Sequence, residues 1–443
     1  MIAALLSVAL APQFDFDLSG AEHWDGLGMQ VFFIDDITGD GVPEFGCGSF
    51  CTDLRDVNSG SVFLFDGYTH NPIRRHDGYG NQARLGETAM TCGDLDGDGY
   101  RDYMGSARNE TVNGLRRGAV YVWSGLTGDL IHFIPGREQE GHFGRGVAAL
   151  PDMDGDGVPD LAIGAPHERD KRGVVGVFSG ATGAFLRQIR GPEAKSQFGY
   201  SLCAIEDING DNVPDLAIGA PYHDEQRGGV YFHSGLDGTL IYSKMGAVTN
   251  SRYGWKVVGV GDVNLDSRPE VLIGEPCTDT AYLVTASTGN ILRSYQGQLN
   301  PTKSGVGHEL AAAGDVDGDG YPDYVIGHPG EWDYNIYHFA GPGGGVTVLS
   351  GRTGMIIASF PPYDLDDGFG SAGAGYSDPH PTGPLIPIRS PAVGGPFRRR
   401  CTGHDFGPNF SVTGKLSLSS HLRIEFAIRI DCRAAFHFPS DFW

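Results

Sequence analysis

Short acidic segments recur six times along the chain, and they carry the residue types best suited to chemistry. One of them, DMDGDGVPD at residues 152–160, places carboxylates at its first, third, fifth and ninth positions, with two glycines between them. Calcium takes six to eight oxygen ligands at about 2.3–2.6 Å, and this segment offers oxygen donors alone. Without a cation, four carboxylates in a tight loop would repel one another. The segment therefore predicts a calcium-binding loop, to which the backbone carbonyl of Val158 adds a ligand.

The other five segments repeat this pattern with graded fidelity. The second and sixth loops keep all four carboxylates of the third, whereas the first, fourth and fifth replace one of them with Thr or Asn. Magnesium fits less well than calcium because it prefers strict octahedral geometry and retains water. We therefore expect Ca²⁺ in several loops, up to about six sites in all. The loops are DITGDGVPE (36–44), DLDGDGYRD (94–102), DMDGDGVPD (152–160), DINGDNVPD (207–215), DVNLDSRPE (262–270) and DVDGDGYPD (315–323). The predicted metal ligands are Asp36, Thr38, Asp40, Glu44, Asp94, Asp96, Asp98, Tyr100, Asp102, Asp152, Asp154, Asp156, Val158, Asp160, Asp207, Asn209, Asp211, Val213, Asp215, Asp262, Asn264, Asp266, Arg268, Glu270, Asp315, Asp317, Asp319, Tyr321 and Asp323.

An EF-hand is the alternative for such a loop, and the sequence argues against it. The EF-hand needs a bidentate Glu at position 12. In loops 2 to 6 that position is occupied by Gly105, Ile163, Ile218, Ile273 and Ile326. The flanking residues also favour strands rather than helices. We therefore expect each loop to lie within a β-hairpin.

The spacing of the loops defines a repeat. Their first residues lie 58, 58, 55, 55 and 53 residues apart, and a regular period of this size indicates a repeat architecture. A large residue followed by glycine, as in Phe143-Gly144, precedes each loop, and a GAP-like tripeptide such as Gly164-Ala165-Pro166 follows the later ones. One four-stranded sheet cannot bury both faces, so the units are expected to stack radially as a β-propeller. The strands predicted for the third unit are Gly144–Leu150, Leu161–Ile163, Val174–Ser179 and Phe185–Arg190.

These landmarks, at these spacings, resemble the FG-GAP repeats of the integrin alpha-subunit propeller over about residues 20–376. The resemblance implies an all-β fold, a seven-bladed β-propeller of four-stranded antiparallel blades, here with six clear repeats plus a degenerate seventh. It also implies calcium in the hairpin between the first two strands of a blade. Stand-alone FG-GAP proteins occur among secreted bacterial proteins. The chain looks more like these than like an integrin, because it has no recognisable thigh or calf domain.

The two ends of the chain depart from the repeat. The apolar stretch at residues 1–13 resembles a signal peptide, which predicts a secreted, extracellular or cell-surface protein, the periplasm included. A misplaced start or an ordinary strand is the alternative. The propeller is expected over residues 14–378, with 14–20 supplying the strand that closes the ring. Residues 379–443 are rich in Pro and Arg and fit three hypotheses: a degenerate seventh blade, an appended β segment, or a tail read in the wrong frame.

Composition excludes several classes of function. A formal net charge of −23 argues against nucleic-acid and anionic-membrane binding, which need basic patches. Beyond the N-terminus, no apolar run approaches the roughly 20 residues of a membrane span. The seven cysteines form no CxxC motif, so a zinc site has no support. Cys47 and Cys51 could pair with each other, or all the cysteines could be thiols.

Recognition is expected on the face opposite the acidic loops, where the segments that follow the GAP-like tripeptides vary. The longest of these segments, residues 328–345, carries aromatic side chains suited to protein or glycan contacts. The alternative is that the aromatic residues only cover their own loop. The candidate ligand-binding residues are Trp332, Tyr334, Tyr337 and His338.

The chain contains no GxSxG, HExxH or P-loop motif, and its acidic residues recur in every unit, as scaffold does. The predicted function is a secreted, non-enzymatic adhesion or recognition module for an extracellular protein or glycan. The alternatives are a carbohydrate-active or other hydrolytic enzyme and a purely structural envelope protein.

Overall fold

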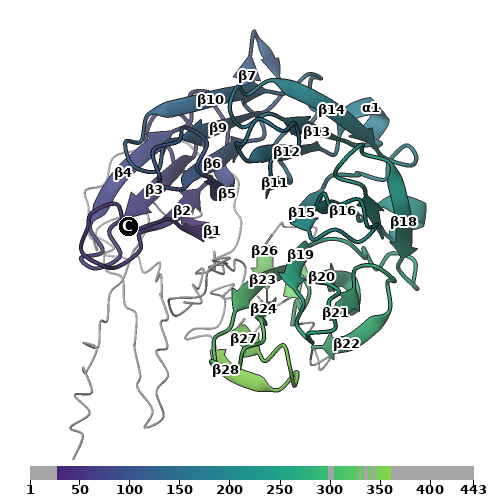
Figure 1. Cartoon of the computed structure of the whole chain (residues 1–443). Coiled ribbons are helices and arrows are strands. Elements are labelled where there is room, and N and C mark those ends of the chain that lie inside the picture. Colours follow the sequence, from purple (N-terminus) through teal and green to yellow (C-terminus); the bar gives the residue numbers. More distant parts are fainter. Residues whose placement is uncertain (1–26, 298–303, 329–330, 334–337, 341–344, 361–443) are drawn as a thin grey trace, which may run out of the picture.

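The computed structural model describes residues 27–297, 304–328, 331–333, 338–340 and 345–360. These residues form six four-stranded antiparallel sheets, which follow one another in sequence order around a common centre (Figure 1). The prediction of an all-β propeller with four-stranded antiparallel blades is confirmed. The count of seven blades is corrected to six in the described residues. The segments assigned to the signal peptide, the closing strand and the seventh blade lie outside them.

Each blade runs from an inner to an outer strand, and all pairings are antiparallel. Blade 1 contains β1 (Leu27–Phe33), β2 (Phe45–Ser49), β3 (Ser61–Phe65) and β4 (Pro72–Asp77). Blade 2 contains β5 (Leu85–Gly93), β6 (Asp102–Ala107), β9 (Ala119–Trp123) and β10 (Leu130–Pro135). Blade 3 contains β11 (Val147–Leu150), β12 (Asp160–Ala165), β13 (Val174–Phe178) and β14 (Phe185–Arg190). Blade 4 contains β15 (Ser201–Ile205), β16 (Asp215–Ala220), β17 (Gly229–His233) and β18 (Leu240–Met245). Blade 5 contains β19 (Val257–Gly261), β20 (Glu270–Glu275), β21 (Thr280–Thr285) and β22 (Ile291–Gln296). Blade 6 contains β23 (Glu309–Gly314), β24 (Asp323–His328), β27 (Gly345–Leu349) and β28 (Ile356–Phe360).

Blade 3 shows where the sequence-based boundaries need correction. Its inner strand begins at Val147 rather than at Gly144, because Gly144 has a φ of +92° and turns the chain before the strand starts. The second strand extends from Asp160 to Ala165 and is buried throughout. A strand that is buried on both faces lacks the alternation of polar and apolar residues that helps to define its ends. The length predicted from the sequence is therefore too short.

The landmark glycines lie where neighbouring blades touch through their backbones. A Cβ atom added at Gly164 of β12 would lie 2.1 Å from the carbonyl oxygen of Gly199 in blade 4. Gly199 itself has a φ of +84°, a conformation that L side chains rarely adopt. The glycine of the GAP-like tripeptide in one blade therefore contacts the glycine that precedes the acidic loop of the next blade.

The hydrophobic core lies between blades rather than within them. One cluster joins Val175 and Val177 of β13 to Phe198, Leu216 and Ile218 of blade 4. These side chains are fully or almost fully buried. Each blade buries its faces only against its neighbours, as expected for a radial repeat.

The third residue of each outer strand in blades 1 to 5 makes a hydrogen bond to the next blade. In each case the acceptor is a backbone carbonyl oxygen in the turn that follows the third strand of the next blade. Arg74 donates to the carbonyl oxygen of Gly125 at 2.6 Å, and Arg293 donates to that of Arg352 at 2.7 Å. The side chains in this set are Arg74, His132, Arg187, Tyr242 and Arg293, which we call the interblade ladder. The sixth blade carries Ala358 at this position, which offers no side-chain donor.

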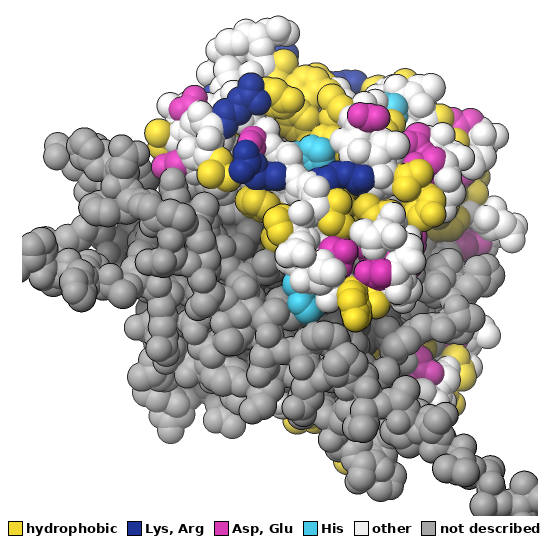
Figure 2. Space-filling view, turned by 90° about the vertical axis from the view of Figure 1, so that its left-hand side faces the viewer, with side chains coloured by type: hydrophobic (Ala, Val, Ile, Leu, Met, Phe, Trp, Pro, Cys, Tyr) yellow, Lys and Arg dark blue, Asp and Glu magenta, His cyan; other side chains and the backbone are white. Residues whose placement is uncertain are grey.

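The outer strands are partly exposed, as in β4, and several of them expose large hydrophobic residues such as Leu130, Phe185 and Ile291. Figure 2 shows basic side chains next to hydrophobic ones on the side of the molecule that lies at the left of Figure 1, where blade 1 is found. No helix in the described part of the chain is long and apolar enough to cross a membrane. Of the five cysteines within the described ranges, Cys47 and Cys92 are buried, and Cys51, Cys203 and Cys277 are partly buried.

The connections between second and third strands differ from blade to blade. Blade 2 carries a protruding hairpin of β7 (Thr111–Val112) and β8 (Leu115–Arg116), seen at the top of Figure 1. Blades 3 to 5 carry single turns: α1 (Glu168–Lys171), α2 (His223–Gln226) and η1 (Pro276–Thr278). In α1, Arg169, Asp170 and Lys171 have positive φ values, so the segment is a series of left-handed turns rather than a helix with a buried face.

Candidate metal-binding loops

The six acidic loops occupy the position that the sequence predicts, the hairpin between the first and second strand of each blade. In blade 3 the loop joins β11 to β12, and residues 152–160 connect Leu150 to the strand that begins at Asp160. The loop is exposed, except that its ninth residue is fully buried.

The first aspartate of each loop organises the backbone. Asp152 Oδ1 accepts a hydrogen bond from the Gly155 N–H at 2.6 Å, and Oδ2 accepts one from the Gly157 N–H at 2.8 Å. Hydrogen bonds from Gly157 and Gly155 lower the pKa of Asp152. These bonds hold the loop closed. Asp36, Asp94, Asp207 and Asp315 accept the corresponding pair of bonds. In the fifth loop, Asp262 accepts one from the sixth residue.

The ninth residue links the loop to the body of the blade. Asp160 Oδ2 accepts a hydrogen bond from the Met153 N–H at 2.8 Å, and Oδ1 accepts one from the Gly180 N–H at 2.9 Å. Asp102, Asp215 and Asp323 make the same two contacts in their blades. The sequence predicted this residue only as a ligand. Its bond to a glycine 20 residues further on appears only in the folded blade.

Burial makes this ninth carboxyl costly to ionise without a cation nearby. It raises the pKa of Asp102 to about 6 and that of Glu44 to about 7. Nearby aspartates of the same loop, Asp96 and Asp94, raise the pKa of Asp102 further, while backbone hydrogen bonds from Gly125 and Leu95 lower it. A divalent cation would reverse both unfavourable effects, because it favours the charged carboxylate.

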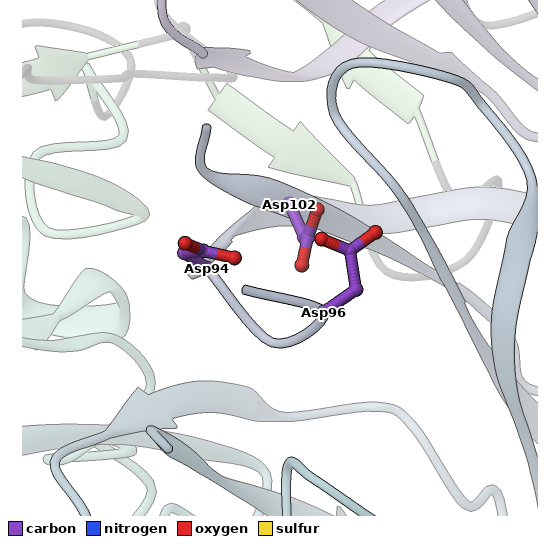
Figure 3. Close-up of side chains that lie close together, drawn as sticks. All are labelled: Asp94, Asp96 and Asp102. Carbon is purple, nitrogen blue, oxygen red and sulfur yellow. The ribbon is translucent and has the colours of Figure 1, made fainter. Parts of the chain in front are cut away.

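Three loops bring their carboxylates into one cluster. In the second loop, Asp94, Asp96 and Asp102 each offer an oxygen, and these oxygens lie within 4.8 Å of one another. Figure 3 shows the three side chains around the turn of this loop. The third loop forms the same cluster with Asp152, Asp154 and Asp160, and the sixth with Asp315, Asp317 and Asp323. These are the loops that keep all four carboxylates in the sequence.

The fifth-position carboxylates lie outside these three clusters. Asp156 Oδ1 accepts a hydrogen bond from the Val158 N–H at 2.9 Å, and Asp98 accepts the equivalent bond from Tyr100. Each therefore supports the turn that presents the carbonyl of the seventh residue. The first, third and ninth residues form the clustered donor set.

Comparison with known proteins agrees with this arrangement. Residues 143–178 and 198–233 match the family model described as "FG-GAP repeat". Integrin alpha-3 of Cricetulus griseus is 31% identical over 199 residues, covering 40% of this chain and 18% of that protein. Integrin alpha-V of Gallus gallus is 28% identical over 222 residues, covering 45% and 21%. The chain therefore carries FG-GAP repeats and is similar to the propeller part of integrin alpha subunits.

A third relative of the propeller carries the name of an enzyme. Phosphatidylinositol-glycan-specific phospholipase D of Bos taurus is 31% identical over 253 residues, covering 49% of this chain and 29% of that protein. The matched part of the propeller thus spans less than a third of each of these relatives. FG-GAP repeats therefore occur in proteins with different names, and the functional conclusion depends on this chain's own residues.

The donor sets of the propeller fit a calcium ion. The clustered donors are carboxylate oxygens alone, the ligands that hard divalent cations take. In the first and fifth loops, Glu44 Oε2 and Glu270 Oε1 are buried and accept no hydrogen bond among the described residues. A buried carboxylate oxygen without a partner is unfavourable, and a cation would supply the missing interaction.

The fifth loop carries more backbone strain than the others. Leu265 and Ser267 stand where the third loop has Gly155 and Gly157, and their φ values are +57° and +66°. The backbone therefore keeps the shape of the repeat although the side chains disfavour it. In the fourth loop, the Asn209 side chain donates to Asp211 Oδ2 at 2.9 Å.

Two of the four candidate ligand-binding residues lie on the strands of a short hairpin. Trp332 belongs to β25 (Glu331–Asp333) and His338 to β26 (His338–Ala340), and the two strands pair antiparallel between β24 and β27. Tyr334 and Tyr337 lie outside the described residues. The backbone brings Asp333 opposite His338, and the expected recognition role of the four residues stays a prediction.

Proposed function

We propose that this propeller is a secreted, calcium-stabilised recognition module that binds an extracellular protein or glycan and carries out no chemistry of its own. The clustering of the first, third and ninth carboxylates in three loops carries the calcium part of the proposal. The integrin alpha relatives support the adhesion or recognition part. The metal ligands we propose are the first-, third-, fifth- and ninth-position residues, with the seventh-position carbonyls.

In this proposal the metal ions act on the scaffold. Each ion would neutralise a loop and fix the hairpin between the first two strands, at the end of the blade opposite the variable connections. Those connections, among them α1, α2 and the β25–β26 hairpin, are then held in fixed positions for recognition. The expected propeller domain spans residues 14–378, preceded by the signal peptide at residues 1–13.

An array of extracellular proteins and glycans, probed with calcium and with EDTA, tests this function. We expect calcium-dependent binding that is lost when Trp332 and Tyr334 are replaced with Ala. Failure to bind any glycan or protein on the array would contradict the proposal.

The alternative is a hydrolytic role, which the phospholipase D relative makes worth testing. A ligand bound on the array would be incubated with the propeller and analysed for released products by chromatography. Turnover that depends on residues of the propeller would replace the recognition proposal with the enzymatic one.

A further inference from the structure

The residues that follow the landmark glycines form a ring at the centre of the propeller. They are Glu87, Arg145, Tyr200, Trp255 and His308, one each from blades 2 to 6. Each lies at or just before the start of an inner strand, at the end opposite the acidic loop. The inner strands converge at the centre of Figure 1, with β5, β11, β15 and β19 side by side in order. We call this set the axial ring.

Contacts run around the axial ring from blade to blade. The Arg145 guanidinium lies 4.1 Å from the centre of the Tyr200 ring, an attractive cation–π arrangement. Tyr200 packs against Trp255 with ring centres 4.7 Å apart, and Trp255 against His308 at 5.5 Å. The Thr88 hydroxyl donates to the Arg145 carbonyl oxygen and ties blade 2 to blade 3.

Cations outnumber carboxylates around the axial ring. Arg108 pairs with Glu87 at 2.6 Å, and Lys256 pairs with Glu309 at 2.7 Å. Among the described residues, Arg145 has no ion pair with a carboxylate. Burial, with Arg145 and then Lys256, lowers the pKa of His308 to about 3, so His308 is neutral near pH 7.

This local excess of positive charge lies in a chain whose formal net charge is −23. Arg84 also lies near Arg108, whose pKa is lowered by burial and further by Arg145 and Arg84, although Glu87 raises it. Burial lowers the pKa of Arg145, but Tyr200, Glu87 and Glu309 raise it by more, so the guanidinium stays charged within the ring. The planar guanidinium is the side chain best suited to hold a carboxylate through two parallel hydrogen bonds.

We propose that the axial ring binds a carboxylate of an acidic peptide segment from an extracellular partner, with Arg145 as its counter-ion. This inference rests on the proposed recognition function and gives it a place and a ligand chemistry. The aromatic residues favour a peptide over an acidic sugar. Arg145 and Trp255 already contact the Tyr200 ring, and Trp255 is only 8% exposed, so the ring offers little open aromatic face for a sugar.

Isothermal titration calorimetry with two capped tetrapeptides, one of glutamate and one of glutamine, tests the axial ring at low ionic strength and saturating calcium. We expect the intact protein to bind the glutamate peptide at least about tenfold more tightly. Arg145→Gln should remove that preference, and Arg145→Lys should keep part of it. The matched control is Arg190→Gln, an exposed arginine on the outer strand of the same blade, which should change nothing.

A gain-of-binding variant separates this role from simple destabilisation. Glu87→Gln removes the carboxylate that pairs with Arg108, so it should tighten binding of the glutamate peptide, an outcome that misfolding cannot produce. Equal affinity for the two peptides, an unaffected Arg145→Gln variant, or no binding would overturn the proposal. Arg145-dependent binding of a glucuronate oligosaccharide in place of the peptide would also overturn it.

The outcome is separable from that of the proposed function. A glutamate peptide that bridges to calcium in the acidic loops would bind equally to Arg145→Gln, so it would not be mistaken for axial binding. If the array yields a calcium-dependent ligand but the tetrapeptides bind alike, only the axial assignment fails.

Discussion

Within each acidic loop, aspartates at different positions have different structural roles. Asp154 is exposed and accepts one long hydrogen bond, from the Asp156 N–H at 3.2 Å. Asp160 is fully buried, and both its oxygens accept backbone hydrogen bonds. In the proposed calcium sites the third position would therefore serve mainly the metal, whereas the ninth would serve both the metal and the fold.

This difference predicts that two alanine variants differ in their unfolding free energy with and without calcium. Asp154→Ala should unfold like the wild type in EDTA but gain less stability from calcium. Asp160→Ala should lose roughly 2–4 kcal/mol of unfolding free energy even in EDTA, because two N–H groups lose a charged acceptor. Urea denaturation with and without calcium measures both. Equal losses for the two variants in EDTA would contradict the assignment.

The positive φ values of the fifth loop predict a stabilising change. Leu265→Gly relieves a left-handed conformation that costs a non-glycine residue about 1–2 kcal/mol, less the roughly 0.5–1 kcal/mol of entropy that glycine loses on folding. We expect a gain of roughly 0.5–1 kcal/mol in the urea midpoint analysis. The reciprocal control, Gly155→Leu in the third loop, should lower stability. A destabilised Leu265→Gly variant would show that the 56% exposed leucine makes a useful contact.

At the scale of the strand, the interblade ladder connects the outer strand of each of blades 1 to 5 to the next blade. Its members are Arg, His and Tyr, so no single residue type marks the position in the sequence. What they share is a donor at the third residue of the outer strand and a carbonyl acceptor in the next blade. The blade interface thus combines a buried apolar cluster with one polar bridge near its outer edge.

Arg293 tests the value of such a bridge. Its guanidinium donates to the carbonyl oxygens of Gly351 and Arg352, at 2.5 and 2.7 Å. Arg293→Met should reduce unfolding free energy by roughly 1–3 kcal/mol, since hydrogen bonds from a charged donor are lost while the chain volume is kept. Arg190→Met, on an exposed part of the outer strand of blade 3, is the control. Similar urea midpoints for the two variants would show that the interblade ladder does not stabilise the fold.

At the scale of the whole molecule, stability is expected to depend on calcium. Six blades each carry an acidic loop, and the formal net charge is −23, so calcium bound as proposed would relieve repulsion throughout the propeller. With affinities on the order of 10⁻⁴–10⁻³ M, 10 mM calcium would add roughly 1.4–2.7 kcal/mol for each occupied site.

Differential scanning calorimetry measures this dependence. Calcium should raise the melting temperature, EDTA should lower it, and magnesium at the same concentration should produce a smaller shift. Superimposable melting curves in calcium and EDTA, from a sample shown to be free of metal, would refute a stabilising role of the loops.

The sequence by itself determined the repeat, the hairpin loops and the blade type. These features are written in local patterns that recur every 53–58 residues: the glycine landmarks, the spaced carboxylates of segments such as 152–160 and the short strands. Loops 2, 3 and 6, which retain every carboxylate in the sequence, are the three whose carboxylates cluster in the structure.

Only the tertiary structure revealed the second role of Asp160, the ladder represented by Arg293, and the axial ring around Arg145. Each depends on contacts between residues far apart in the chain, and in the ladder and the ring the equivalent positions hold different residue types. A periodic sequence shows which positions are equivalent. Which side chains meet across blades is decided by the radial packing, because each blade buries its faces only against its neighbours.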